Sequence, residues 1–340
     1  MSVRLLDVTL RDGGYVNDHN FSDNEAHSIV NGLGKANIEY AELGYYRPSQ
    51  IDSSGRFRQG PAVSDSEYLA GFIDAGTSPK LVVMVHLDRV TLKEYKMLSD
   101  FNISLVRVIV KPETPENFDV VRKHIEAIKD WGMLCSVNLI RVSEIPLDSI
   151  VSYGKKSEAF GADFFYIADS NGSLFPSQVY ATVRELSENL SIQIGFHAHD
   201  GLSLAFANSV AAIDAGVHIL DSTLGGMGKG GGNLRTELIA TYLNWGKGST
   251  YNLSQLAQIT QEYISKWLTF NSINKCKNVL SSIMNLNIDK IQAIEETAKE
   301  ANLPSLNLME KLLTNEVEAV NFQRKIRLDE TIFRAKKSLI

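Results

Sequence analysis

The sequence has few cysteines and no long hydrophobic segment. Its 340 residues include two cysteines, Cys135 and Cys276, and neither has a second Cys or a His at ligand spacing. A disulfide framework and a thiolate zinc site are therefore not expected. No apolar run reaches the roughly 18 residues that a membrane span needs. The chain starts with a strand-like segment rather than a signal peptide, so we expect a cytoplasmic protein without membrane contact.

The sequence also lacks a basic block. Its formal charge of -6 comes with no cluster of Lys and Arg that could neutralise a phosphate backbone, so nucleic acid is not an expected partner. Hydrophobic residues make up 44% of the chain and charged residues 22%, which is ordinary for a globular protein with a sizeable core.

Short β-rich runs recur through the first 245 residues, and each is followed by a segment with helical spacing of apolar residues. Residues 81–85 and 164–168 are continuously apolar, as strands buried on both faces require, and this predicts parallel pairing. The eight predicted strands span residues 3–8, 40–43, 80–86, 104–110, 134–140, 164–168, 192–196 and 218–220.

Helix candidates follow these strands, among them residues 115–131, 176–190 and 233–245. Eight βα units over about 245 residues match the size of a TIM (β/α)8 barrel, and a doubly wound open sheet is the alternative. Polar and glycine-bearing clusters come directly after the strands, and in a barrel they would share the C-terminal mouth, where active sites lie. This arrangement favours the barrel. The clusters are residues 11–14, 42–44, 169–172, 197–201 and 225–233.

The character of the sequence changes near residue 247. Residues 248–340 lack strand-like runs and carry helical patterns, at 253–267, 288–301 and 305–320. We therefore predict a barrel domain over residues 1–247 and a helical C-terminal extension over 248–340. The extension could cap the barrel or form an oligomer contact, and we expect a homo-oligomer.

His197 and His199 stand two residues apart at the end of the seventh predicted strand, so their imidazoles point the same way. Asp12 ends the first strand, which only the eighth strand separates from the seventh in a closed barrel. One carboxylate and two imidazoles form a half-open site suited to Mg²⁺, Mn²⁺, Zn²⁺, Co²⁺ or Fe²⁺. The alternative is a turn-capping aspartate beside two ordinary polar histidines.

Other polar residues near strand ends are further candidates. Arg11 is a permanent cation that could hold a carboxylate or stabilise an enolate, or it could form a structural ion pair with Glu42. Glu42 could orient Arg11 or a metal-bound water. Asn233 follows a glycine-rich loop and could cap the next helix or supply an oxygen ligand. Ser170 could point a hydroxyl into the mouth, and the weaker candidates are Asn138, His86 and Arg107.

The segments 7–13, 168–172, 197–200 and 231–233 together resemble the metal-dependent TIM-barrel lyases that include HMG-CoA lyase, 4-hydroxy-2-oxovalerate aldolase and isopropylmalate synthase. The resemblance covers about residues 3–245. It implies a divalent cation, Mn²⁺ or Mg²⁺ in the first place, with Zn²⁺ or Co²⁺ as alternatives. It further implies that the ligands are Asp12, His197 and His199, with Asn233 as a further candidate ligand. Arg11 is then expected to stabilise an enolate, and Ser170 to contact either the substrate or a metal ligand.

Several residues differ from the family pattern, and these differences indicate which branch of the family the chain resembles. Met227 stands where HMG-CoA lyases carry a cysteine, and Lys229-Gly230 where isopropylmalate synthases carry an acidic and a basic residue. The aldolases have a histidine three positions after the metal aspartate, where this chain has Tyr15, with His19 nearby. A phenol serves as a base at neutral pH only where neighbouring cations stabilise the phenolate.

The resemblance is strongest to the aldolase branch. We therefore expect a carbon–carbon lyase that forms or cleaves the bond between a 2-oxo acid such as pyruvate and an aldehyde through an enolate, with Arg11 and either Tyr15 or His19 as catalytic residues. Glu42, Asn138 and Ser170 are expected at the substrate. The alternatives are a Claisen-type transferase acting on an acyl-CoA and a 2-oxo acid, and a metal-binding barrel without catalysis.

Overall fold

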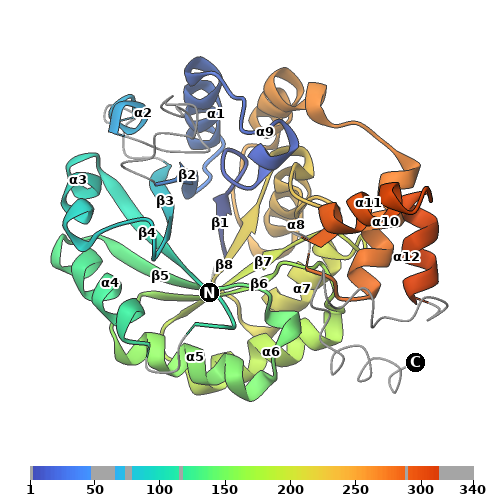
Figure 1. Cartoon of the computed structure of the whole chain (residues 1–340). Coiled ribbons are helices and arrows are strands. Elements are labelled where there is room, and N and C mark those ends of the chain that lie inside the picture. Colours follow the sequence, from blue (N-terminus) through green and yellow to red (C-terminus); the bar gives the residue numbers. More distant parts are fainter. Residues whose placement is uncertain (1–2, 47–65, 73–78, 115–117, 288–289, 314–340) are drawn as a thin grey trace.

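The computed structural model describes residues 3–46, 66–72, 79–114, 118–287 and 290–313. Eight parallel strands close into a barrel in chain order, with β1 paired to both β2 and β8 (Figure 1). This confirms the predicted TIM barrel, and each predicted strand end lies within two residues of the observed one. The strands are β1 Arg4–Asp7, β2 Tyr40–Tyr45, β3 Lys80–His86, β4 Ile103–Val110, β5 Leu134–Leu139, β6 Phe164–Asp169, β7 Gln193–Ala198 and β8 Ile219–Ser222.

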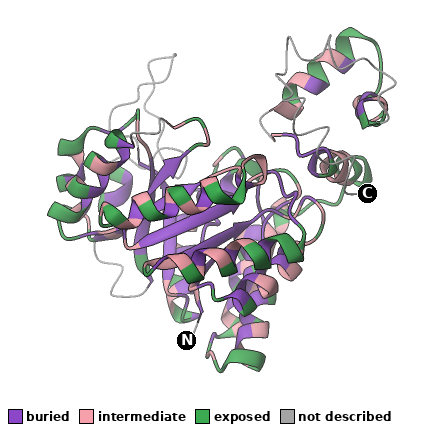
Figure 2. Cartoon of the chain, turned by 90° about the horizontal axis from the view of Figure 1, so that it is seen from below, coloured by how far each residue is buried: buried purple, intermediate pink, exposed green. Residues whose placement is uncertain are grey.

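Alternate residues of each strand enter two different hydrophobic cores. Leu6 and Val82 belong to the core inside the barrel, whereas Leu5 and Val83, their neighbours in sequence, pack with the surrounding helices. Side chains alternate across a strand, so a strand that is covered on both sides must be apolar throughout. Figure 2 shows the strands buried at the centre and the helices exposed on their outer faces.

Helices follow the strands around the barrel, as the apolar spacing predicts. Ser22 and Glu25 form a capping box that begins α1, and Pro176 occupies the first turn of α6, where its missing N–H costs no hydrogen bond. The start of the helix predicted from residue 115 lies partly outside the described residues. The barrel helices are α1 Asp23–Lys35, α2 Ser66–Ala70, α3 Tyr95–Asp100, α4 Asp119–Asp130, α5 Leu147–Ala159, α6 Pro176–Asn189, α7 Ala205–Ala215 and α8 Thr236–Lys247.

The C-terminal region is helical, as expected, and its helices belong to two cores. Leu256 and Ile259 join the main barrel core, whereas Met284, Ile294 and Met309 belong to a second, smaller core. Buried residues up to Ile264 therefore belong to the main core, and those from Met284 onward belong to the second core. The domain boundary at residue 247 stays a prediction. The helices are α9 Leu253–Ile259, continued by a π-helix Thr260–Ile264 and a 3-10 turn Ser265–Trp267, then α10 Ser272–Ile283, α11 Ile291–Glu300 and α12 Ser305–Leu313.

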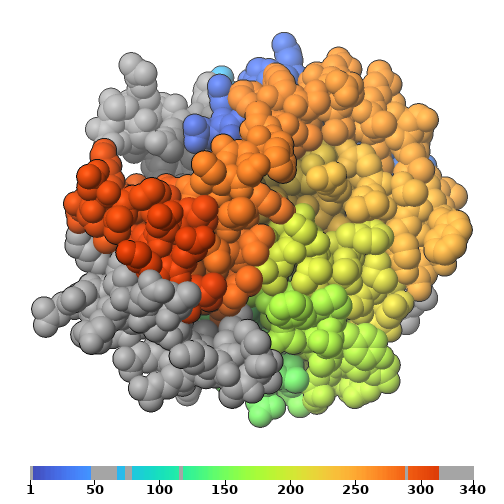
Figure 3. Space-filling view, turned by 90° about the vertical axis from the view of Figure 1, so that its right-hand side faces the viewer, coloured from blue at the N-terminus to red at the C-terminus, as the bar shows by residue number. Residues whose placement is uncertain are grey.

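Helix α10 and the residues after it are attached to the barrel mouth by polar side chains. Asn278 donates to the carbonyl oxygen of Gly230 at 3.0 Å, and Ser282 donates to that of Asn171 at 2.8 Å. Asn285 donates to the carbonyl oxygen of Ser143 at 3.0 Å. Helix α10 and the residues that follow it thus lie beside the loops that end β5, β6 and β8. Figure 3 shows the orange and red C-terminal region packed beside the yellow and green part of the barrel. Residues 314–320 of the last predicted helix lie outside the described part of the chain.

No helix in the described part of the chain is long and apolar enough to span a bilayer. Cys135 is buried and Cys276 is exposed, and both are free thiols.

Asp7 ends β1 and is fully buried. Its carboxylate accepts hydrogen bonds from the Thr9 amide at 2.9 Å and from the Thr236 hydroxyl at 3.1 Å. Burial nevertheless raises the pKa of Asp7 to about 7, because the two hydrogen bonds only partly replace hydration of the charge. The folded state therefore favours protonated Asp7 relative to the unfolded chain, where an aspartate has a pKa near 4.

We expect this difference to make stability fall as pH rises. The folded chain holds the Asp7 proton between about pH 4 and pH 7 while the unfolded chain has released it, so this contribution is full below pH 4 and lost above pH 7. Asp7→Asn should flatten the decline in the free energy of unfolding between pH 5 and pH 8, measured by urea denaturation. Asp88→Asn, at an exposed position, is the control. An equally steep decline in Asp7→Asn would contradict this prediction.

Candidate active site

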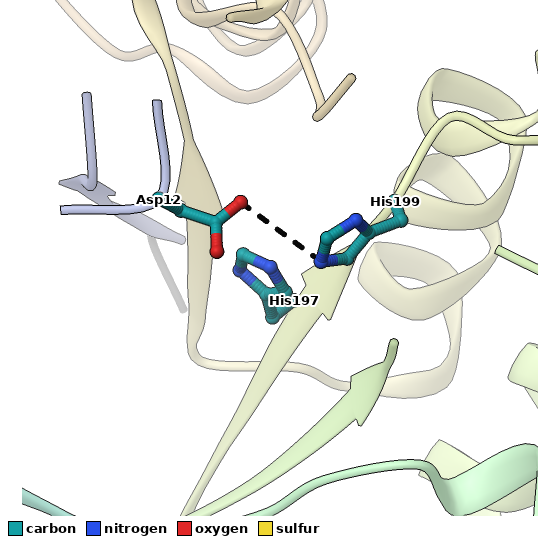
Figure 4. A group of neighbouring side chains, drawn as sticks. All are labelled: Asp12, His197 and His199. Atoms are coloured by element: carbon teal, nitrogen blue, oxygen red, sulfur yellow. Dashed lines mark ion pairs between the residues drawn. The ribbon is translucent and has the colours of Figure 1, made fainter. Parts of the chain in front are cut away.

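Asp12, His197 and His199 converge at the C-terminal mouth of the barrel (Figure 4). One ligand atom from each lies within 4.8 Å of the other two, and all three side chains are buried. Asp12 follows β1, and the histidines stand on and just beyond the end of β7. Closure of the barrel through β8 is what brings these segments together, as the strand count predicts.

Each imidazole is oriented by a hydrogen bond at Nδ1. His197 Nδ1 lies 2.9 Å from Asp221 Oδ2, and His199 Nδ1 lies 3.3 Å from the carbonyl oxygen of Lys229. Both partners are acceptors, so each Nδ1 carries the proton and each Nε2 keeps a lone pair. Nε2 of His199 lies 3.9 Å from Asp12 Oδ2. The two nitrogens are thereby set up as metal ligands.

Asn233 adds an oxygen to the cluster. Its Nδ2 donates to Asp12 Oδ2 at 2.7 Å and to the Met227 carbonyl at 3.2 Å. Its Oδ1 is buried and has no hydrogen-bond partner in the described structure. A buried acceptor without a donor fits a position next to a cation. The helix-cap interpretation of Asn233 is wrong, because α8 begins at Thr236 with Arg235 as its N-cap residue.

The protonation states of the cluster suit a cation. Burial by itself would raise the pKa of Asp12, but Arg11, His199 and His197 hold it well below its usual value. Burial lowers the pKa of His199 to about 4, although Asp12 opposes the shift. At neutral pH the carboxylate is therefore ionised and His199 is neutral, which are the forms that bind metal. A carboxylate, two imidazoles and an amide oxygen together fit a divalent ion.

A chain of buried ion pairs lies beneath these residues. Arg11 binds Asp12 Oδ1 through Nη1 at 2.5 Å and Glu42 Oε2 through Nε at 2.6 Å. Arg107 binds the other oxygen of Glu42 at 3.2 Å and Asp221 Oδ2 at 2.6 Å. Asp221 in turn contacts His197. Arg11 thus forms the ion pair with Glu42 considered from the sequence and also lies beside the metal cluster.

A cavity of about 610 Å³ opens above the cluster. Glu42 lies beneath it, and Asn233 reaches the cluster through Asp12. Ser170 accepts a hydrogen bond from the Arg141 amide at 3.0 Å, and Asn138 lies 2.7 Å from the Ser136 hydroxyl. The predicted residues that line the cavity are Arg11, Asp12, Tyr15, His86, Arg107, Asn138, Ser170, His197 and His199.

The two candidate bases occupy different positions. Tyr15 lines the cavity, and its hydroxyl lies 3.1 Å from that of Tyr45. Lys229 Nζ lies 5.0 Å from the centre of the Tyr15 ring. His19 packs edge-on against that ring at 4.9 Å and is not among the described residues that line the cavity. The structure therefore brings Tyr15, rather than His19, to the cavity.

Some residues of the site were missed from the sequence. Asp221 lies on β8, but the predicted eighth strand ends at residue 220, so its position on the barrel was not recognised. Tyr45 lies in an extension of β2 beyond the predicted end at residue 43. Extending these two predicted strands by two residues, with side chains alternating between the two faces, would have placed Asp221 and Tyr45 on the barrel.

The fold and this site define a metal-dependent TIM-barrel enzyme. The family described as HMGL-like matches residues 2–262. The 4-hydroxy-2-oxovalerate aldolase of Moorella thermoacetica is 32% identical over 243 residues, which are 72% of this chain and 70% of that protein. The Carboxydothermus hydrogenoformans protein of the same name is 30% identical and covers 77% of each chain.

Solved structures agree with these relatives. The N-terminal domain of a Bacteroides vulgatus protein described as an aldolase aligns with a TM-score of 0.72 and 25% identity, over 86% of this chain and 96% of that one. The carboxyl transferase domain of Rhizobium etli pyruvate carboxylase shares the fold, with a TM-score of 0.71 and 17% identity, over 88% of this chain and 54% of that one. The chain belongs to the HMGL-like family, and the predicted resemblance is confirmed.

Removal of one imidazole should weaken metal binding. His199→Ala leaves Asp12, His197 and Asn233 in place, and we expect the Mn²⁺ affinity measured by isothermal titration calorimetry to fall at least about 100-fold. His27→Ala, which removes a histidine of α1, should bind Mn²⁺ as the wild type does. Equal affinities of His199→Ala and wild type would exclude this cluster as the metal site.

Proposed function

We propose that the chain is a divalent-metal-dependent aldolase that forms or cleaves the carbon–carbon bond next to the carbonyl group of a 2-oxo acid such as pyruvate. The observation that carries the proposal is the placement of Arg11 beside Asp12, His197 and His199 in one cavity. The relatives named 4-hydroxy-2-oxovalerate aldolase support the reaction class.

Asp12, His197, His199 and the unpartnered oxygen of Asn233 would hold the ion. We propose Mn²⁺ or Mg²⁺, with Zn²⁺ or Co²⁺ as alternatives, because the donors are nitrogen and oxygen without a thiolate. The ion would supply Lewis acidity that draws negative charge from the 2-oxo acid. Asp221 and the Lys229 carbonyl would fix the two imidazoles through Nδ1.

Arg11 would stabilise the enolate. Asp12 and Glu42 hold its Nη1 and Nε, while Nη2 has no partner among the described residues. A guanidinium fixed at two nitrogens keeps the third in one position at the cavity wall. A preorganised donor of this kind stabilises charge as it develops, without reorganising during the reaction.

Tyr15 would carry the proton to and from the aldehyde oxygen. Burial raises the pKa of Tyr45 well above its usual value, so Tyr45 stays protonated and can donate to the Tyr15 oxygen. Lys229 adds a positive charge beside the Tyr15 ring. Tyr15 would thus have a hydrogen-bond donor and a cation beside it at the position where the resemblance places a histidine in other aldolases.

Assembly and location are further proposals. Phe270 and Ile273 are 87% and 60% exposed, beside and within α10. Exposed apolar side chains at the start of α10 and just before it support a homo-oligomer contact through the C-terminal extension. The cytoplasm is proposed as the location, in keeping with the free thiols of Cys135 and Cys276.

The enolisation step can be measured without an aldehyde. We expect Mn²⁺-dependent deuterium incorporation into the methyl group of pyruvate in D₂O, followed by NMR. Arg11→Lys should slow the exchange about 100-fold at saturating Mn²⁺, as loss of one oxyanion donor does in other enzymes. Arg184→Lys, an exposed position on α6, is the control. An exchange rate that does not depend on Mn²⁺, or that is unchanged in Arg11→Lys, would refute the proposed function.

Tyr15→Phe tests the proton carrier. Loss of a general acid–base group typically costs 10²- to 10⁴-fold, so we expect such a drop in kcat for pyruvate addition to aldehydes, larger by at least about tenfold than any drop in deuterium exchange. Tyr180→Phe on α6 removes the hydroxyl of an exposed tyrosine and should match wild type. A large loss in His19→Gln with little change in Tyr15→Phe would assign the role to His19 instead.

A further inference from the structure

The cavity is larger than the reactants of the named relatives require. A 4-hydroxy-2-oxovalerate molecule has nine non-hydrogen atoms, which occupy at most about 270 Å³ if each takes the ~30 Å³ of a liquid water. The cavity measures about 610 Å³. With acetaldehyde as the acceptor, the substrate would therefore fill less than half of the volume that the described residues enclose.

The additional space lies across the mouth from the metal cluster. The cluster stands at the ends of β1 and β7, with β8 between them. Lys111 and Arg141, which also line the cavity, come just after β4 and β5. In a closed barrel of eight strands these are the strands opposite β8 and β1. An aldehyde that adds to pyruvate at the cluster would therefore extend toward Lys111 and Arg141.

The wall on this side is polar and carries charges of both signs. Lys111, Glu113 and Arg141 line it, and Arg141 pairs with Glu113 and, at 3.2 Å, with Glu144, which lies outside the lining. Asn287, from beyond α10, adds an amide that can donate and accept. These groups offer both hydrogen-bond donors and acceptors. They match hydroxyl groups better than an alkyl chain.

The remaining wall supplies a small apolar surface. Met84 and Ile140 line the cavity at the ends of β3 and β5. A hydroxylated carbon chain presents C–H groups as well as hydroxyls, so it can contact both kinds of wall at once.

We propose that the acceptor is a hydroxylated aldehyde of at least three carbons, an open-chain sugar or a related compound, whose hydroxyls bind Lys111, Glu113 and Asn287. The inference rests on the proposed aldolase function. In the reaction C3 of pyruvate bonds to the aldehyde carbon, one proton leaves C3, and one proton is added to the aldehyde oxygen. No oxidant or reductant is consumed, and the product is a 2-oxo acid with hydroxyls from C4 onward.

Matched aldehydes test the inference. With pyruvate and Mn²⁺ held constant, kcat/KM is measured for D- and L-glyceraldehyde against propanal and for erythrose and threose against butanal, corrected for the free carbonyl fraction. We expect at least one hydroxylated aldehyde to exceed its alkyl counterpart about 100-fold. Equal values would overturn the inference. A preference for glyceraldehyde 3-phosphate over glyceraldehyde would also overturn it, because the acceptor would then be anionic.

Variants locate the preference in the wall. Lys111→Met and Asn287→Leu keep side-chain size but lose hydrogen bonds, and each should lower the hydroxyaldehyde-to-alkyl ratio about tenfold. Lys93→Met, at an exposed lysine of the Leu92–Glu94 turn, is the control and should keep the wild-type ratio. An unchanged ratio in both wall variants would refute the assignment.

Pyruvate deuterium exchange without aldehyde separates the two levels of the proposal. Exchange by the wild type together with no preference for hydroxyaldehydes would refute only the inference about the acceptor. Absence of metal-dependent exchange would refute the aldolase function itself.

Discussion

The alternating chain of buried charges from Asp12 through Arg11, Glu42 and Arg107 to Asp221 is the constraint on which the site depends. Buried ions are tolerated only when each has partners, and here every carboxylate touches a guanidinium. Two guanidinium groups against three carboxylates leave one negative charge in the barrel interior. A divalent cation offsets that charge, so the same network that orients the ligands also favours an ion among them.

Closure of the barrel brings the members of this network into contact. Its five members come from β2, β4, β8 and the turn after β1, positions spread over 210 residues of sequence. Inward-facing residues of several strands meet only because the sheet closes on itself. Tyr166 adds to the packing, since its ring lies 4.4 Å from the guanidinium carbon of Arg107. Charge pairing and barrel closure therefore support one another.

Most of the fold was predictable, because continuous apolar runs such as 81–85 need cover on both faces and so specify parallel strands. The His-x-His pair and Asp12 were predictable for a related reason, since strand order alone places them together. Asp221 was missed because the predicted eighth strand ends at residue 220, and Lys111 was missed because a single charged residue just after a strand has no periodic signature. The positions of Tyr15 and His19 were not predictable either, because side-chain packing is what places Tyr15 at the cavity and His19 against the Tyr15 ring.

The attachment of α10 to the barrel mouth has an evolutionary consequence. Asn278, Ser282 and Asn285 reach carbonyl oxygens of the backbone at Gly230, Asn171 and Ser143. Every amino acid supplies such an oxygen. Substitutions in these loops therefore keep the hydrogen bonds to the helix, as long as the backbone path is unchanged. Evolution can therefore change the substrate preference through the loop side chains without changing how the C-terminal helices are attached.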